Sequence, residues 1–147
     1  MSKITVAVGS DHGGFEYKES IINHLKSKGF EVIDCGTHTK NSCDYPDIAK
    51  EVVSKILNKN ADKGILICGT GIGMSISANK YRGIRAALCS DTFSAHACVE
   101  HNNANVLCLG QRVLGENLAL EIVDVWLNSE FQGGRHQIRV DKIEARN

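Results

Sequence analysis

A cysteine followed by a glycine-rich run is the part of this sequence that points most directly to chemistry. Residues 68–73 read Cys-Gly-Thr-Gly-Ile-Gly, at the end of the apolar stretch 64–68. Glycines let backbone N–H groups approach an oxyanion, and a helix beginning near Met74 would add positive potential. Both effects favour a thiolate, so Cys68 is a candidate base or nucleophile. The alternative for any cysteine is a small buried core residue. Cys68 differs from the other five cysteines, because none of them has comparable glycine-rich surroundings in the sequence.

The spacing of these glycines excludes the common nucleotide-binding loops. A dinucleotide fingerprint needs a glycine at the sixth position, but counting from Gly69 that position is Met74. A Walker A loop needs a Gly-Lys pair, and the chain has none. Cysteine phosphatases place an arginine after five intervening residues, where this chain again has Met74. The run therefore indicates an oxyanion-binding turn of another kind.

The elements that must position this turn follow from the apolar pattern, in which short runs alternate with helical periodicities. Strands are expected at residues 4–8, 31–34, 64–68, 85–89 and 105–109. Helices are expected from Gly13 and Gly14, from an N-cap at Asp47, and over 92–101, 118–127 and 135–146. Continuous apolar strands imply burial on both faces. We predict a single α/β domain over residues 1–147, with an open parallel five-stranded sheet in a Rossmann-like three-layer α/β/α arrangement.

Ligands of such sheets bind at the carboxyl ends of the strands. The first expected strand ends in residues 9–14 (Gly-Ser-Asp-His-Gly-Gly), and the fifth ends in residues 110–112 (Gly-Gln-Arg). Together with residues 68–73, these turns are expected to meet at one edge of the sheet.

Composition narrows the class of protein. The 147 residues include 17 Lys plus Arg and 17 Asp plus Glu, so no positive surplus gathers nucleic acid. Neither a signal peptide nor a membrane span is recognisable, which favours a cytoplasmic protein with no membrane partner. The six cysteines are therefore expected to be free thiols, and the Cys and His spacings fit no structural zinc site.

The motifs taken together resemble one known family, the type B ribose-5-phosphate isomerases, over nearly the whole chain. The motifs that carry the resemblance are residues 9–14, 44–47 (Asp-Tyr-Pro-Asp), 68–73, 101–102 (His-Asn), 109–112 (Leu-Gly-Gln-Arg) and 133–137 (Gly-Gly-Arg-His-Gln). The resemblance implies aldose–ketose isomerisation of a phosphorylated sugar through an enediolate, in the pentose phosphate pathway, with no metal or redox cofactor. Allose-6-phosphate and galactose-6-phosphate isomerases are its close relatives, so the sugar stays open.

The resemblance also implies roles for individual residues. Cys68 would be the base, Thr70 with the amides of Gly69, Gly71 and Gly73 would stabilise the enediolate, and His101 would open the sugar ring. Hydroxyl and pocket contacts would come from Asn102, Asp11 and Tyr45. Each of three residues has a purely structural alternative: His101 as a solvated helix cap, Asp11 as a helix N-cap and Tyr45 as a packed loop aromatic.

The resemblance assigns phosphate binding to four cationic side chains. His12, Arg112, Arg135 and Arg139 would surround the phosphate, and the two last share a face if residues 135–146 are helical. A solvated basic helix is the alternative, preferred for Lys142 and Arg146.

The resemblance implies a homodimer with a shared active site, or a tetramer of two such dimers. The partner subunit would supply the histidine–asparagine pair and the arginine after the fifth strand. An alternative of another class is a non-catalytic phosphate- or flavin-binding module, although the flanking aromatics of a flavin site are lacking.

Overall fold

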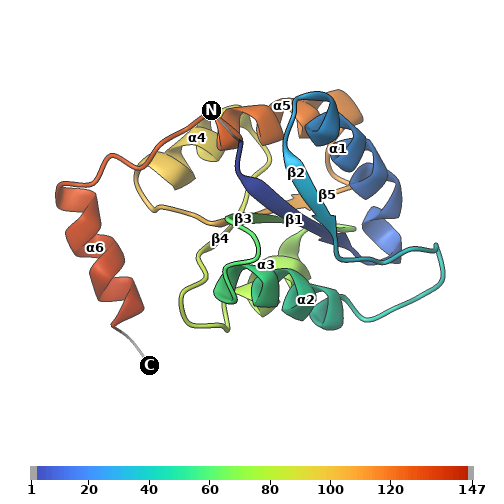
Figure 1. The fold of residues 1–147 in the computed structure, drawn as a ribbon, viewed down its shortest axis with the longest axis horizontal. Coiled ribbons are helices and arrows are strands. Elements are labelled where there is room, and N and C mark those ends of the chain that lie inside the picture. The colour runs from blue at the N-terminus through green and yellow to red at the C-terminus, as the bar shows by residue number, and fades with distance from the viewer. Residues whose placement is uncertain (1–2, 146–147) are drawn as a thin grey trace.

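The computed structural model describes residues 3–145 and is built around one sheet of parallel strands (Figure 1). The strands lie in the order β2-β1-β3-β5-β4. Their bounds are β1 (Thr5–Ser10), β2 (Glu31–Asp34), β3 (Lys63–Cys68), β4 (Ala86–Leu88) and β5 (Val106–Gly110). The predicted open parallel five-stranded sheet is confirmed, with bounds close to those expected.

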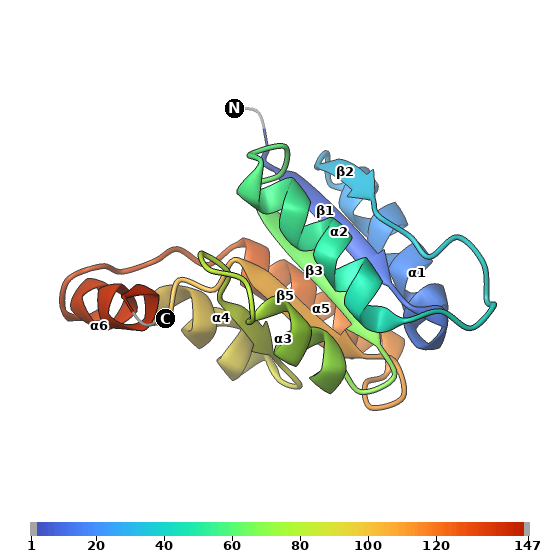
Figure 2. The ribbon, with the colours of Figure 1, turned by 90° about the horizontal axis from the view of Figure 1, so that it is seen from below.

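Helices cover both faces of the sheet, and one further helix lies apart. The helices α1 (Phe15–Ser27), α4 (Thr92–Glu100) and α5 (Glu116–Leu127) cover one face, whereas α2 (Tyr45–Leu57) and α3 (Ile72–Ala78) cover the other (Figures 1 and 2). A short 3-10 helix, η1 (His12–Gly14), precedes α1. In both views α6 (Arg135–Glu144) projects from the body beside α4. Within residues 3–145, every helix is too short or too polar to cross a membrane.

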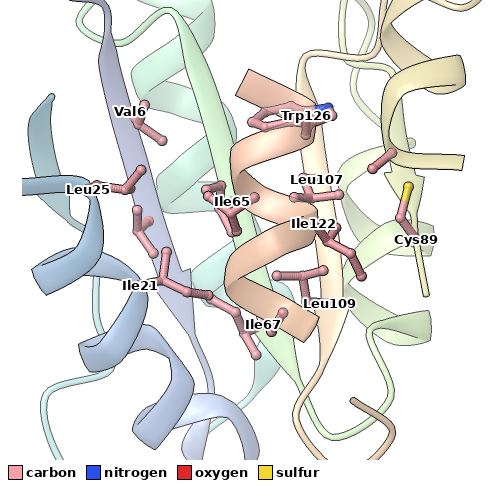
Figure 3. Close-up of a cluster of buried hydrophobic side chains, with 14 of the residues drawn as sticks. Val6, Ile21, Leu25, Ile65, Ile67, Cys89, Leu107, Leu109, Ile122 and Trp126 are labelled. Carbon is pink, nitrogen blue, oxygen red and sulfur yellow. The ribbon is translucent and has the colours of Figure 1, made fainter. Parts of the chain in front are cut away.

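The hydrophobic core is divided between the two faces of the sheet. Between the sheet and the helices α1, α4 and α5, Trp126 and Ile122 pack on strand residues such as Ile65 and Leu107 (Figure 3). A second buried cluster, which includes Val52 of α2, fills the opposite face. This two-sided burial explains why the central strands read as continuous apolar runs. It also holds the strand ends in fixed positions.

Three helices begin earlier than expected: α3 at Ile72 instead of near Met74, α5 at Glu116 instead of residue 118, and α2. Asp47 is not the N-cap of α2, because the helix begins at Tyr45 and Asp44 occupies the N-cap position. Pro46 stands in the first turn, where its missing N–H costs nothing and its fixed φ suits the helix. The end expected at residue 146 for the last helix lies outside the described residues. The earlier start of α2 brings Tyr45 to the edge of the sheet where β1 and β3 end.

Candidate active site

A cavity of about 420 Å³ opens at the carboxyl ends of β1 and β3. The chain leaves β1 toward β2 on one side and later enters β3 on the other, so the sheet reverses its winding direction between them. Open α/β sheets bind their ligands at such a reversal. The lining residues come from the turns after β1, β3 and β5 and from the starts of α2 and α3: Asp11, Tyr45, Cys68, Gly69, Thr70, Ile72, Gly73, Ile76 and Arg112.

Cys68 is the last residue of β3, and its side chain is only 5% exposed. The backbone N–H of Gly71 donates a hydrogen bond to its Sγ, at 3.1 Å. The turn at residues 68–71 thus places a thiol that can exchange a proton at the wall of the cavity.

This hydrogen bond corrects the expected role of Gly71. Its amide was expected to face an enediolate oxygen together with the amides of Gly69 and Gly73. At φ +81°, Gly71 instead turns its N–H back toward the sulfur three residues earlier. Gly69 and Gly73 line the cavity, whereas Gly71 is buried beneath it.

The other cysteines have different surroundings. All six are free thiols. Burial raises the pKa of Cys35 to about 11 and also raises the pKa of the deeply buried Cys108. Among residues 3–145, no group of three or more His, Cys, Asp and Glu side chains could hold a metal ion. Of these thiols, Cys68 is the one that lines the cavity beside the glycine-rich turn.

Two polar side chains, Thr70 and Asp11, line the cavity. Thr70 Oγ1 accepts a hydrogen bond from Ile72 N at 3.2 Å, which leaves its hydroxyl hydrogen able to donate to a ligand. Asp11 lies at the end of β1, 7% exposed, and its Oδ1 accepts from Gly13 N at 2.9 Å. Asp11 therefore caps η1, as the structural alternative required, and also lines the cavity.

Tyr45 and His12 border the same edge of the sheet. The Tyr45 ring covers Gly73 so closely that a Cβ there would lie 2.6 Å from a ring carbon, so Tyr45 forms a wall of the cavity. His12 is exposed, and its Nδ1 accepts from Cys43 N at 3.2 Å. A neutral His12 ring then carries its proton on Nε2.

The position of Arg112 corrects a second expectation. The arginine after the fifth strand was expected to reach the site from a partner subunit. In the structure, Arg112 lies in the cavity of its own chain, with Cδ 3.4 Å from the point that a Cβ on Gly69 would occupy. The physical reason is that β3 and β5 are neighbours, so the turns that follow them meet directly.

The remaining predicted residues form a second group at the opposite edge of the sheet. His101 and Asn102 follow the end of α4, and Arg135 and Arg139 lie on α6. A helix that connects parallel strands runs back against them, so α4 ends near the amino ends of the strands. One chain therefore does not bring this group to Cys68.

A stacked pair of histidines anchors the second group. The rings of His101 and His136 are stacked, with centroids 4.5 Å apart and planes inclined by 19°. Lost hydration lowers the pKa of His136, and the nearby positive groups His101, Arg135 and Arg139 lower it further. Arg135 and Arg139 lie one turn apart on the predicted helix, and both are exposed.

Sequence reasoning missed four residues around these two groups. Ile72 and Ile76 line the cavity with exposed fractions of 51% and 58%, and the sequence analysis gave neither of them a role. His136 stood in a quoted motif but received no role. Gln111 also stood in a motif, beside Arg112, and only the structure reveals its partner, Tyr17 N.

Comparisons with known proteins agree on one family. The model of the family described as Ribose/Galactose Isomerase matches residues 6–143. Ribose-5-phosphate isomerase B of Escherichia coli is 50% identical over 95% of this chain and 94% of its own. A ribose 5-phosphate isomerase structure from Thermotoga maritima has a TM-score of 0.96 at 53% identity, over 97% of this chain and 99% of its own. A Mycoplasma genitalium ribose-5-phosphate isomerase B solved with ribulose-5-phosphate bound has a TM-score of 0.91 at 44% identity, over 95% of this chain and 93% of its own.

Proposed function

Because the chain belongs to the ribose/galactose isomerase family and is an aldose–ketose isomerase, we propose that it interconverts ribose 5-phosphate and ribulose 5-phosphate through an enediolate. The observation that carries the proposal is the Cys68 thiol in the cavity at the sheet reversal, with an amide 3.1 Å from its sulfur. The names of the relatives support the five-carbon sugar. Isomerisation of allose 6-phosphate or galactose 6-phosphate is the alternative, and the family match overturns a non-catalytic binding module.

The proposed proton transfer uses Cys68 as the only base. The thiolate removes the proton from C2 of the open-chain aldose, and the electrons move onto the carbonyl oxygen at C1. The resulting enediolate is stabilised by Thr70 and by the amides of Gly69 and Gly73, in the manner of an oxyanion hole. Within the enediolate the proton of the O2 hydroxyl moves to O1. The Cys68 thiol then returns its proton to C1 while the electrons on O2 form the C2 carbonyl, so the ketose forms and the thiolate is regenerated.

Ring opening is assigned to His101, which in this proposal comes from the partner subunit. His101 would move a proton from the anomeric hydroxyl to the ring oxygen, and Asn102 would bind a sugar hydroxyl. The nine residues of α4 span about 14 Å and lead away from the carboxyl edge of the sheet, which separates His101 from the Cys68 of its own chain. A homodimer with two shared sites removes this separation.

Exposed apolar side chains support the shared site. Around the edge that carries the cavity, Phe93 is 69% exposed and Val113 is 59% exposed, in addition to Ile72 and Ile76. The α6 helix exposes Ile138, at 61%. Apolar surface gathered in this way marks an interface. Docking a partner's α6 near the cavity rim would cover it and bring Arg135 and Arg139 to the phosphate, beside Arg112 and His12.

The substrate is tested by assaying three sugars side by side with the purified enzyme. Ribose 5-phosphate should give the highest kcat/KM, above allose 6-phosphate and galactose 6-phosphate. A higher kcat/KM for either six-carbon sugar would replace the five-carbon assignment. No turnover of any of the three would refute the proposed function.

The division between ring opening and proton transfer has a separate test. His101→Ala should lose activity on cyclic ribose 5-phosphate by roughly a hundredfold or more, the usual range for an acid–base group. Ribulose 5-phosphate cannot close a furanose ring, so exchange of its carbon-bound hydrogen with solvent deuterium reports proton abstraction directly. This exchange should be retained much better in His101→Ala. Equal loss of both rates would disprove the division.

A further inference from the structure

The turn after β5, residues 110–114, is tied to the turn that carries Cys68. Two of its amides, Gln111 N and Arg112 N, donate to the carbonyls of Cys68 and Gly69, at 2.9 and 3.0 Å. The Arg112 side chain continues over Gly69, with Nη1 3.5 Å from the point that a Cβ on Gly69 would occupy. The main chain therefore fixes one side of this turn against the cavity.

The other side of the turn is held by α1. Gln111 Oε1 accepts a hydrogen bond from Tyr17 N, at 3.0 Å. The Tyr17 hydroxyl donates to the carbonyl of Leu114, at 2.6 Å, and Leu114 is itself buried in the core. Tyr17 is the donor in both bonds, one from its main chain and one from its side chain, so the turn is held to α1 at two points.

The bond to Gln111 is also an unusual helix cap. Tyr17 N is one of the first amides of α1, which have no partner within the helix. The N-cap residue, Gly14, supplies no side-chain acceptor. Gln111 fills that place from a distant turn. The start of α1 and the turn that carries Arg112 are thereby fixed to each other.

We propose that Gln111 and Tyr17 are positioning residues for phosphate recognition, which hold the 110–114 turn so that Arg112 stays over Gly69. This inference rests on the proposed role of Arg112 as a phosphate ligand. Neither Gln111 nor Tyr17 is among the described residues that line the cavity, so both act through Arg112.

The physical reason is preorganisation. A guanidinium that is already aimed at the phosphate loses little further freedom when the substrate binds, whereas a mobile turn loses more. Because the phosphate is bound at the end of the sugar remote from C1 and C2, that cost should appear in KM rather than in kcat. Binding of inorganic phosphate alone should carry the same cost.

The test removes each bond without removing volume. Gln111→Met and Tyr17→Phe should each raise KM for ribose 5-phosphate roughly threefold to tenfold, with kcat within about twofold of the parent enzyme. The inhibition constant of inorganic phosphate should rise by the same factor. Tyr81→Phe, which deletes a phenol hydroxyl on the loop after α3, serves as the matched control and should leave both constants unchanged.

A double-mutant cycle with Arg112→Ala separates positioning from structure. In the Arg112→Ala enzyme, Gln111→Met should cause no further rise in KM, since its effect passes through the missing guanidinium. If the increases in KM from the two single substitutions multiply in the double variant, Gln111 acts independently of Arg112. If Gln111→Met lowers the unfolding stability and leaves KM unchanged, Gln111 has a structural role only. Both results would overturn the inference. If Arg112→Ala itself leaves KM unchanged, the assignment of Arg112 under the proposed function fails instead.

Discussion

The cavity and the α6 region bear the two halves of the proposed site, yet they are built in opposite ways. The cavity lies where strand-end turns meet, and its cysteine is 5% exposed and fixed by an amide at 3.1 Å. The α6 helix has two buried residues, His136 and Val140. It is fastened at its two ends, by the His101–His136 stack and by the ion pair between Glu144 and Arg85.

This structural difference matches two different functions, proton transfer and substrate capture. Proton transfer from carbon needs a base held within a fraction of an ångström, and turns anchored in a close-packed sheet supply that. Substrate capture, beyond the fixed Arg112, needs the α6 cations to reach a site on a partner subunit in the proposed dimer. A helix on few contacts, at the edge of the fold, suits that second requirement.

Removing the base should have the largest effect. Cys68→Ala should lower kcat by about a thousandfold or more, since it removes the proposed base, while substrate binding changes little. Steady-state kinetics and equilibrium binding of ribose 5-phosphate measure the two effects. The matched control is Cys43→Ala, in the loop before α2, which should retain the parent kcat. If Cys68→Ala turns over substrate nearly as fast as the parent enzyme, Cys68 is not the base.

Mixing two inactive enzymes should recover activity if the halves come from different chains. Equal amounts of Cys68→Ala and His101→Ala, unfolded together and refolded, should regain about a quarter of parental activity, because half of the dimers are mixed and each mixed dimer has one intact site. Refolding each variant alone is the control. No recovery, with sedimentation showing that mixed dimers have formed, would place both halves of the site in one chain.

Much of the cavity could be predicted because its signals are local. Glycine runs after apolar strands mark the turns, and the parallel sheet brings the turns together, so Cys68, Thr70 and Asp11 were placed correctly at one edge. The direction of the Gly71 amide was not predictable, because it depends on one backbone dihedral angle. The place of Arg112 depends on which strands are neighbours, and the sequence does not state the strand order.

The α6 region was harder to predict for a different reason. Its helical periodicity correctly placed Arg135 and Arg139 on one helix. Periodicity does not show which part of the protein a helix packs against. The stacking of His136 on His101 joins residues far apart in the sequence, with no local pattern to mark it. Contacts between such distant segments become visible only in the folded chain.

A smaller effect should come from the α6 cations. Arg139→Ala should raise KM for ribose 5-phosphate by about tenfold with a lesser change in kcat, because a phosphate contact acts mainly through binding. Lys142→Ala, on the same helix, is the control and should leave KM unchanged. Equal KM values for both variants and the parent would show that Arg139 is a solvated surface residue. The assignment of substrate capture to α6 would then be wrong.

The smallest effect concerns how firmly α6 is attached at different pH values. The pKa of His136 is lowered in the folded chain, so the unfolded or undocked ring binds protons more readily. The stabilisation from a neutral His136 is therefore complete above the ordinary histidine pKa of 6.5 and is lost as the pH falls through that value toward the lowered one. Hydrogen-exchange protection factors of α6 amides should fall between pH 7.5 and pH 5.5, by at most about tenfold for each unit of pKa difference. Protection of β3 should not follow the same curve.

His136→Phe tests whether this ring is the cause. Phenylalanine keeps a flat ring against His101 but cannot ionise, so the repulsion with His101, Arg135 and Arg139 on acidification disappears. The α6 protection factors of this variant should be nearly independent of pH over the same interval. If they still fall as in the parent, another group controls the attachment, with His101 the first to test by His101→Asn. If the parent itself shows no change, α6 is held as firmly at pH 5.5 as at pH 7.5, and the contrast between a rigid cavity and a loosely attached helix is weaker than the contacts indicate.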